Sequence, residues 1–300
     1  MGRLTAIVLG SAAGGGYPQW NCRCAVCRLA WDGDPRVTPR TQASLVVSAD
    51  GKHWTLLNAA PDLRAQLAAT PALHPRSLRG SPIAAVVLTG GEIDQTAGLL
   101  NLRERQPFTL FATEDTHTAL ADNPMFGALA PDVVTRRAVM PGNAFVLPGG
   151  VSAELFMVPG KVPLYLEKGA VQTSIESGAN VGVEIRAEGA TLMFVPGAAE
   201  VTPALRERLA RADAILFDGT LFTDDEMIAS GTGEKGGRRM GHMPIDGSDG
   251  SLAALKGLGK RRIYIHINNT NPILIDGASE RRRVEDAGFE VAADGLEIRL

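Results

Sequence analysis

The sequence has little of what nucleic-acid-binding and membrane proteins require. Lysine and arginine number 30 against 33 acidic residues, so the formal net charge is −3 and no basic surface for nucleic acid or lipid is indicated. Aromatic residues make up only 5% of the chain, too few to predict a base-stacking platform. No hydrophobic stretch is long enough to span a bilayer. These shortages argue against nucleic-acid partners and membrane insertion.

Targeting signals, repeats and linkers are also lacking. The N-terminal apolar run is short, and glycines interrupt it before a signal-peptide core develops. We therefore expect a cytoplasmic protein. No fixed-period repeat or proline-rich linker divides the 300 residues, and 45% of them are hydrophobic, which is enough for a sizeable core. The expectation is a single domain over residues 1–300.

Strand-like and helix-like segments follow one another along the whole chain. Several strand-like segments are continuous apolar runs, as expected for strands covered on both faces. The predicted strands are 4–9, 44–47, 54–58, 83–88, 109–111, 153–158, 182–186, 191–195, 214–217, 262–267 and 296–300. Helices are expected after Pro61, over about 96–105, after the capping pair Thr202-Pro203, and after a cap at Ser248 or Asp249. This mixture predicts an α/β fold with two packed sheets.

The three cysteines of the chain fall within six positions, at Cys22, Cys24 and Cys27. Sulfurs at this spacing in a loop can turn to one point, and thiolates are preferred donors for tetrahedral Zn²⁺. Two other interpretations are one disulfide with a spare thiol, or three small apolar fillers. A cytoplasmic location argues against the disulfide, and the tight clustering argues against fillers. We predict a structural zinc in the cysteine loop, residues 17–30.

Acidic residues follow two of the predicted buried strands. Glu92 and Asp94 come after strand 83–88, and Asp218 comes after strand 214–217. His266 lies near the end of a third strand, before a polar run. Loops at strand ends are where α/β folds place their sites, so these four side chains are expected in one pocket. Such a donor set suits Fe²⁺, Mn²⁺ or Mg²⁺. The alternatives are that Glu92 and Asp94 only cap a helix, and that His266 is a hydrogen-bonded core residue.

His242 is our candidate for the fourth zinc ligand. The pocket claims His266, while His53, His74 and His117 lie in ordinary surface-like contexts. The alternative is that His242 is a loop residue with no role. The segment 220–241 just before it is rich in glycine, aspartate and lysine and has little apolar content, so we predict a mobile loop or lid there.

Four stretches of the chain resemble the pyrroloquinoline quinone (PQQ) biosynthesis protein B family. They read GSAAGGGYPQWNCRC at 10–24, VPGKVPL at 158–164, LFDGT at 216–220 and HINNTNP at 266–272. The matches are spread from residue 4 to the C-terminus. The family belongs to the metallo-β-lactamase superfamily, which implies an αββα sandwich. In related branches a cysteine cluster and a downstream histidine hold a structural zinc, which supports the set Cys22, Cys24, Cys27 and His242.

The H-x-H-x-D-H loop of the superfamily falls on residues 90–95. Gly90 and Glu92 stand in place of its first two histidines, Asp94 is retained, and Gln95 replaces the last histidine, which family members often keep. Glutamine is a weak, neutral ligand.

The other superfamily ligands are partly present. Asp218 matches the bridging aspartate and His266 the last histidine, whereas neither Pro159 nor Gly160 can supply the third-motif ligand. Too few ligands remain for two zinc ions. The resemblance therefore implies one metal ion, held by Glu92, Asp94, Asp218 and His266 or a subset of them.

The function implied by the resemblance is a step in making PQQ from a peptide precursor. That step is iron-dependent, O₂-using hydroxylation of the tyrosine ring of a cross-linked Glu–Tyr intermediate. A mononuclear Fe(II) site with few protein ligands leaves positions open for O₂ and substrate. Lys161 is assigned to a substrate carboxylate, and Asn268, Asn269 and Asn271 to polar substrate groups. The alternatives are that Lys161 is simply solvated and that the asparagines form a turn before Pro272.

The resemblance leaves two other functions open. One is a carrier that binds PQQ or its precursor for delivery to the periplasm, which the replacement at Gln95 favours. The other is a hydrolase of the parent superfamily acting on phosphodiesters or thioesters, against which the loss of ligands counts. The expected partners are PQQ or its peptide-derived precursor, other PQQ biosynthesis proteins, and a second copy in a homodimer.

Overall fold

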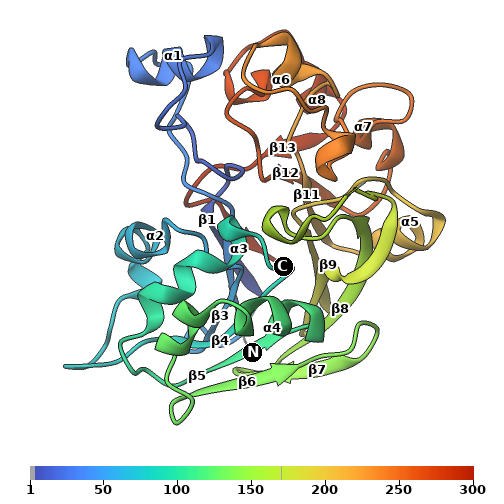
Figure 1. Ribbon diagram of the computed structural model, residues 1–300. Coiled ribbons are helices and arrows are strands. Elements are labelled where there is room, and N and C mark those ends of the chain that lie inside the picture. The colour runs from blue at the N-terminus through green and yellow to red at the C-terminus, as the bar shows by residue number, and fades with distance from the viewer. Residues whose placement is uncertain (1–3, 170) are drawn as a thin grey trace.

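The chain folds into two β-sheets packed face to face, with helices on their outer faces (Figure 1). This computed structural model describes residues 4–169 and 171–300. The predicted domain 1–300 includes residues 1–3 and 170, which lie outside the described residues. The αββα architecture expected from the sequence is confirmed.

Each sheet contains seven strands of the described chain. From edge to edge, the first consists of β14 (Glu297–Arg299), β1 (Thr5–Gly10), β2 (Ser44–Ser48), β3 (Trp54–Leu57), β4 (Ile83–Val87), β5 (Phe108–Ala112) and β6 (Val134–Ala138). The second consists of β13 (Phe289–Val291), β12 (Arg261–Ile265), β11 (Ala214–Asp218), β10 (Ala190–Val195), β9 (Ile175–Ala187), β8 (Val151–Gly160) and β7 (Ala144–Leu147). The first sheet thus includes the last strand of the chain, because β14 pairs antiparallel with β1.

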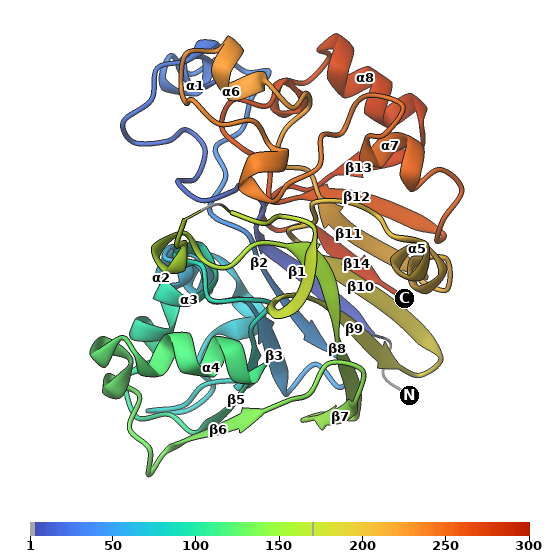
Figure 2. The ribbon, with the colours of Figure 1, turned by 45° about the vertical axis from the view of Figure 1, so that its right-hand side comes forward.

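Helices cover the outer face of each sheet, and two lie toward one end of the sandwich (Figure 2). The first sheet is covered by α2 (Leu63–Ala69), α3 (Ile93–Thr96) and α4 (Glu114–Ala121). The second is covered by α5 (Pro203–Leu209), α7 (Ser251–Ala254) and α8 (Ser279–Asp286). Toward the end lie α1 (Ala25–Trp31) and α6 (Glu226–Ala229). Short 3₁₀ helices occur at Pro71–Leu73, Ala97–Leu102, Pro124–Ala128, Leu164–Leu166, Arg238–Met240 and Pro272–Leu274.

The continuous apolar runs of the sequence are explained by burial on both faces of a strand. In β2, Leu45 and Val47 point into the core between the sheets, and Val46 points toward the helices. In β11, Leu216 faces the other sheet, while Phe217 packs under the outer helices. Full burial of each such side chain contributes about 1.5–3 kcal/mol. The strands are therefore anchored from both sides, which fixes the ends that carry the site.

Two predicted helices differ from those observed. The helix expected over 96–105 divides into α3 and the 3₁₀ helix Ala97–Leu102, because the Gly98 N–H donates to the Ala59 carbonyl at 2.8 Å instead of within an α-helix. The cap expected at Ser248 or Asp249 is wrong, since α7 begins after Gly250. The Thr202 cap is confirmed, because its hydroxyl accepts a hydrogen bond from Leu205 N at 3.2 Å.

The loop that follows β1 joins the two sheets at the end where the site lies. Ala12 pairs with Gln42 of the first sheet's side and with Ile267, which follows β12 of the second sheet. This contact brings the carboxyl ends of β4, β11 and β12 together. Among the described residues, no helix is both long enough and apolar enough to cross a membrane.

Candidate active site

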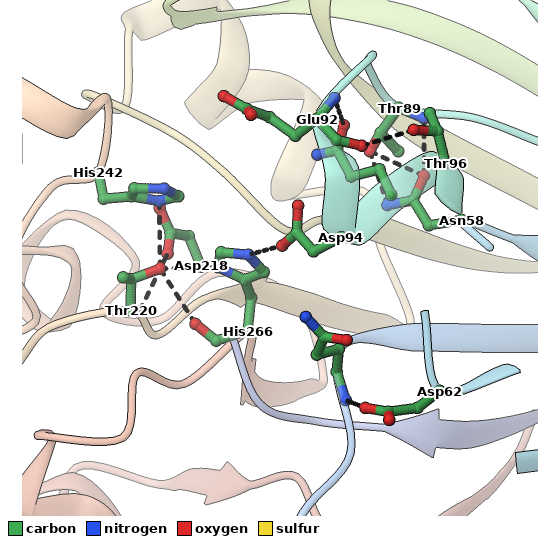
Figure 3. A network of polar contacts seen from close by, with 12 residues as sticks. Asn58, Asp62, Thr89, Glu92, Asp94, Thr96, Asp218, Thr220, His242 and His266 are labelled. Carbon is green, nitrogen blue, oxygen red and sulfur yellow. Dashed lines mark hydrogen bonds and ion pairs between the residues drawn. The ribbon is translucent and has the colours of Figure 1, made fainter. Parts of the chain in front are cut away.

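Two aspartates, two histidines and a threonine converge where strands of both sheets end (Figure 3). Asp94 lies in the first turn of α3, Asp218 is the last residue of β11, and His266 directly follows β12. The donor atoms of Asp218, His242 and His266 lie within 4.8 Å of one another. These residues come from segments far apart in the chain, and the strand ends bring them together.

Asp218 is fully buried and surrounded by hydrogen-bond donors. One carboxylate oxygen accepts from Thr220 N at 3.0 Å and from the Thr220 hydroxyl at 2.6 Å. The other accepts from Ala198 N at 2.9 Å and lies 2.7 Å from His242 Nδ1. Burial alone would raise the pKa of Asp218, but the charge and hydrogen bond of His242 hold that pKa below its usual range. Asp218 is therefore an ionised carboxylate, as a metal ligand must be.

His266 connects Asp94 to the rest of the cluster. Its Nε2 lies 2.9 Å from Asp94 Oδ2, and its Nδ1 lies 2.8 Å from the Thr220 hydroxyl. Burial would lower the pKa of His266, but its hydrogen bond to Asp94 and the neighbouring carboxylates raise that pKa above the usual value. The imidazole rings of His242 and His266 stack with centroids 5.2 Å apart. Two nitrogen donors and two carboxylates thus occupy one small volume.

The backbone at His266 adopts a conformation that is rare for a residue with a side chain. Its φ is 58°, in the left-handed region, which costs on the order of 1–3 kcal/mol. The flanking contacts hold it there, because the Thr220 hydroxyl lies 3.0 Å from the His266 carbonyl oxygen and Ile267 N donates to Ser11 O at 2.9 Å. This turn directs the imidazole toward Asp94.

Thr220 is a site residue that sequence reasoning missed. Its hydroxyl lies within hydrogen-bond distance of Asp218, His242 at 3.1 Å and His266. The available signal was its place in the LFDGT stretch, two residues after Asp218. A threonine in that position can link two ligand side chains without being a ligand itself.

The structure corrects the predicted role of His242. This residue does not join the cysteines; it contacts Asp218 and belongs to the group with His266. The reason is the path of the chain after Asp218, since Met243 N donates to Ala198 O at 2.7 Å and so returns the segment to the end of β10. Over two hundred residues separate His242 from the cysteines, and sequence spacing cannot determine which site it reaches.

The three cysteine sulfurs do gather at one point, within 4.8 Å of one another, and all three thiols are free. Cys27 lies on α1, so the predicted loop 17–30 is helical in its second half. Asn269 faces the sulfurs: its side-chain nitrogen lies 3.2 Å from both Cys22 Sγ and Cys27 Sγ. Burial raises the pKa of the Cys27 thiol to about 12, so a cation is needed to hold it as a thiolate at neutral pH.

Asp94, Asp218, His242 and His266 form what we call the aspartate–histidine group, and Glu92 does not belong to it. Its carboxylate lies 2.8 Å from Lys161 Nζ and accepts from Leu164 N at 3.1 Å. Lys161 also forms an ion pair with Glu167 at 3.1 Å and is only 12% exposed. The structure therefore contradicts the predicted ligand role of Glu92. It also contradicts the alternative of a solvated Lys161, since this lysine is paired and largely buried. The ammonium group, as a strong cation, draws this carboxylate away from the ligand set.

Gln95 caps a helix and does not point a donor at the other ligands. Its side-chain oxygen accepts from Glu92 N at 3.4 Å, and the Glu92 side chain completes the capping box. The same oxygen fills the space above Gly90: a Cβ there would lie 2.7 Å from it and 2.8 Å from Ala179 O. A side chain at position 90 would therefore collide with both Gln95 and the backbone of Ala179, which explains the glycine there.

The three asparagines predicted to bind substrate have different environments. Asn268 lines the cavity, and its amide donates to the Thr270 hydroxyl at 2.6 Å. Asn269 faces the cysteines instead. Asn271 is fully buried and donates to Gly219 O at 2.9 Å, while its oxygen caps the turn at Ile273. The substrate-binding prediction is therefore wrong for Asn269 and Asn271, and the turn before Pro272 is confirmed.

The aspartate–histidine group lies beside a cavity of about 510 Å³. Its walls come from the glycine run after β1, the 92–95 turn, the end of β8 and the segment 220–241. That segment contains α6 and a 3₁₀ turn, and Arg238 N donates to Asp224 Oδ1 at 2.8 Å. Its mobility stays a prediction. The cavity volume suits a small organic molecule.

Glu226 is a buried acid within this segment, at the start of α6. Its oxygens accept from Phe222 N at 2.6 Å and from the Thr270 hydroxyl at 2.5 Å. Burial raises the pKa of Glu226 from 4.5 to about 7. The group is therefore protonated in the folded protein at pH values where it is already ionised in the unfolded chain.

This raised pKa predicts a pH-dependent stability. The contribution of Glu226 is full below its unfolded pKa near 4.5 and is lost as the pH rises to about 7, by about 3 kcal/mol in total. Glu226→Gln resembles the neutral acid, with its oxygen accepting from Phe222 N and its NH₂ group donating to the Thr270 hydroxyl, but it cannot ionise, so it should lack this loss. Urea unfolding at pH 5 and pH 8 measures it, with the exposed Glu207→Gln as control. Equal pH dependence in Glu226→Gln and the wild type would contradict the prediction.

Comparisons with known proteins agree with this fold. A model described as a beta-lactamase superfamily domain matches residues 53–267. The chain is 55% identical over 298 residues to coenzyme PQQ synthesis protein B of Rhizobium meliloti, covering 99% of this chain and 98% of that protein. It is 54% identical over 299 residues to the protein of that name from Methylobacterium nodulans, covering 99% and 100%.

Solved structures show the same fold. The crystal structure of Zn²⁺-bound PqqB from Methylobacterium extorquens is similar with a TM-score of 0.97 and 52% identity, over 99% of this chain and 100% of that chain. A diphosphatase from the PhnP family has a TM-score of 0.68 at 22% identity, over 99% and 97%, which shows the shared fold alone.

Proposed function

Since this chain belongs to the coenzyme PQQ synthesis protein B family of the β-lactamase superfamily, we propose that it acts in PQQ biosynthesis as a mononuclear Fe(II)-dependent oxygenase. The proposed reaction is hydroxylation of the tyrosine ring of a cross-linked Glu–Tyr precursor. The observation that carries the proposal is the grouping of His242, His266 and Asp218. Two histidines and one carboxylate with open positions are typical of non-haem Fe(II) oxygenases.

The residues fit such an ion. His242 and His266 provide neutral nitrogen donors when deprotonated, and the ionised Asp218 is held by Ala198 N and Thr220 N. Thr220 orients both histidines through its hydroxyl, as an outer partner of metal ligands does. Bound Fe(II) would supply the activation of O₂ that organic side chains cannot.

Asp94 is the further carboxylate beside this set. It lines the cavity, and its oxygen lies 2.9 Å from His266 Nε2. Burial would raise the pKa of Asp94, but the hydrogen bond and charge of His266 hold it below the usual range, so the group is ionised. It can therefore accept a hydrogen bond from a phenolic substrate hydroxyl in the cavity and orient the ring.

The cysteine cluster is proposed to hold a structural zinc ion, as the Zn²⁺-bound relative supports. Asn269 replaces His242 as the candidate fourth ligand because its amide faces Cys22 and Cys27. The oxygen and nitrogen of an asparagine amide exchange places on rotation of the group, so the same position can present an oxygen to a cation. Four ligands close the tetrahedron and leave no position for chemistry.

Metal content and turnover together test the oxygenase. The protein purified without O₂ should hold about one zinc ion per chain and bind one Fe(II) ion. With O₂ and a tyrosine- or catechol-containing precursor analogue, labelled oxygen should enter the product. Asp94→Ala and His266→Ala should reduce this incorporation by on the order of a thousandfold.

Glu92→Gln is the control for the ligand set. Because Glu92 pairs with Lys161 and not with the histidines, this variant should keep its iron. Loss of iron in Glu92→Gln would restore Glu92 as a ligand. Zinc without iron binding or turnover, in a protein that still binds PQQ or its precursor, would refute the oxygenase and establish a carrier. The capping role of Gln95, which leaves position 95 without a ligand, is the observation that favours that second function.

A further inference from the structure

The cavity has an excess of positive charge away from the aspartate–histidine group. Among the described residues that line it, the other charged side chains are three cations, Lys161, Lys235 and Arg239, and two carboxylates, Glu92 and Glu167. Lys161 pairs with both carboxylates, at 2.8 Å and 3.1 Å. Glu167 is shared with Arg239, so the three cations exceed the two carboxylates by one charge, and Lys235 makes no ion pair among the described residues.

The donors of Arg239 are available to a ligand. Arg239 Nη2 lies 3.7 Å from Glu167 Oε2, an ion-pair contact that is too long for a hydrogen bond. In the described part of the chain, neither the Arg239 guanidinium nor Lys235 Nζ lies within hydrogen-bond distance of an acceptor. A guanidinium presents parallel N–H groups that match the two oxygens of a carboxylate, so an unused one on a cavity wall is suited to that group.

The backbone fixes these two side chains relative to the metal ligands. Both lie on the segment 220–241, which lies between Asp218 and His242 in the sequence. Gly237 N donates to Asp224 O at 2.9 Å, and Arg238 N donates to the Asp224 carboxylate at 2.8 Å. These bonds close the segment on itself and leave Lys235, Arg239 and Met240 lining the cavity.

The geometry points to Arg239 and Lys235 as a carboxylate-binding pair that selects a polycarboxylate substrate and holds it with its aromatic ring toward Asp94 and the histidines. This inference rests on the proposed function, since a cross-linked Glu–Tyr molecule carries two α-carboxylates and one side-chain carboxylate. Arg239 binds one of these groups through two N–H donors, and Lys235 binds another as a point charge. Lys161 pairs with Glu92 and shares Glu167 with Arg239, so in the described part of the chain neither carboxylate takes a hydrogen bond from Arg239 or Lys235.

Equilibrium binding of PQQ, an aromatic tricarboxylate, tests the pair without turnover. Arg239→Gln and Lys235→Gln should each weaken binding about tenfold, and the double variant about a hundredfold. The wild-type affinity should fall with added salt, and less steeply in the variants. Inorganic phosphate should compete only weakly, which separates a carboxylate site from a general anion site.

Arg238→Gln is the matched control. It makes the same charge change one residue away, but Arg238 is paired with Asp249 at 2.5 Å and does not line the cavity. The affinity of Arg238→Gln for PQQ should equal that of the wild type. Unchanged zinc content and melting temperature would show that each variant is folded. Equal affinity in Arg239→Gln and Arg238→Gln, or full competition by phosphate, would overturn the inference. If PQQ binding weakens in the Arg239 and Lys235 variants as expected but no labelled oxygen enters the product, the proposed oxygenase activity is refuted and the carboxylate-binding pair is not.

Discussion

Replacing Asp218 with asparagine is expected to remove iron from the active site and to lower turnover by about a thousandfold or more. Asp218 is the carboxylate proposed to bind the metal with His242 and His266, and a neutral amide is a poor ligand for Fe(II). Iron per chain and incorporation of labelled oxygen measure the effect. Asp132→Asn changes an exposed carboxylate that pairs with Arg105; it is the control and should leave both unchanged.

The same substitution should also destabilise the protein. Both carboxylate oxygens of Asp218 accept backbone N–H bonds, from Thr220 on one side and Ala198 on the other. An asparagine has one oxygen, so its NH₂ group must face one of these donors, at a cost of about 1–3 kcal/mol.

Thr220→Val separates loss of a metal ligand from loss of hydrogen bonds at the site, because it removes the shared hydroxyl and keeps every ligand. We expect a loss of about tenfold to a hundredfold in activity with iron retained. Normal turnover in Asp218→Asn would rule out this residue as a ligand.

Replacing Cys27 with serine is expected to lower the melting temperature by roughly 10 °C. Zinc present at a thousandfold excess over its dissociation constant stabilises a folded protein by about 4 kcal/mol, and each kcal/mol corresponds to about 2–4 °C in a large domain. Cys27 is fully buried on α1, and its sulfur is one of the three that gather beside Asn269. A serine hydroxyl is a poor substitute for a thiolate at Zn²⁺.

Calorimetry and zinc analysis of Cys27→Ser measure this effect. Treating the wild type with a strong chelator should produce the same shift, and restored zinc should reverse it only in the wild type. Val26→Ala, which removes a buried apolar group from the same helix without touching a sulfur, controls for lost packing and should keep its zinc. An unchanged melting temperature after complete zinc removal would show that the cluster contributes nothing to stability.

The sequence was sufficient for the sandwich and for most of its central strands. Strands such as β2 and β11 are buried on both faces, and their continuous apolar runs are a direct record of that burial. The strands that were missed lie at sheet edges. β6 has four exposed residues of five, and β13 is only three residues long, so neither gives an apolar run long enough to be recognised. Edge strands are fixed by their neighbours and not by their own composition.

The site was predictable as a set of strand ends but not as a set of contacts. Asp94, Asp218 and His266 were found because each follows a buried strand. Glu92 was misplaced because its partner, Lys161, lies 69 residues away. His242 was assigned to the wrong cluster because only the fold shows that its segment returns to Asp218. Spacing predicts neighbours along a strand or loop, whereas these pairings depend on which loops meet in three dimensions.

The antiparallel pairing of β14 with β1 has a consequence for how the protein is made on the ribosome. β1 is synthesised long before β14, because almost the whole described chain lies between the two strands that place Ile298 opposite Ala6. Asp294, just before β14, also bonds Ser11 and Thr41 at the base of the glycine run. One edge of β1 therefore stays open until β14 has been made. The nascent chain has to keep that edge from pairing with other chains during this time, which makes slow translation and crowding of nascent chains conditions that favour aggregation.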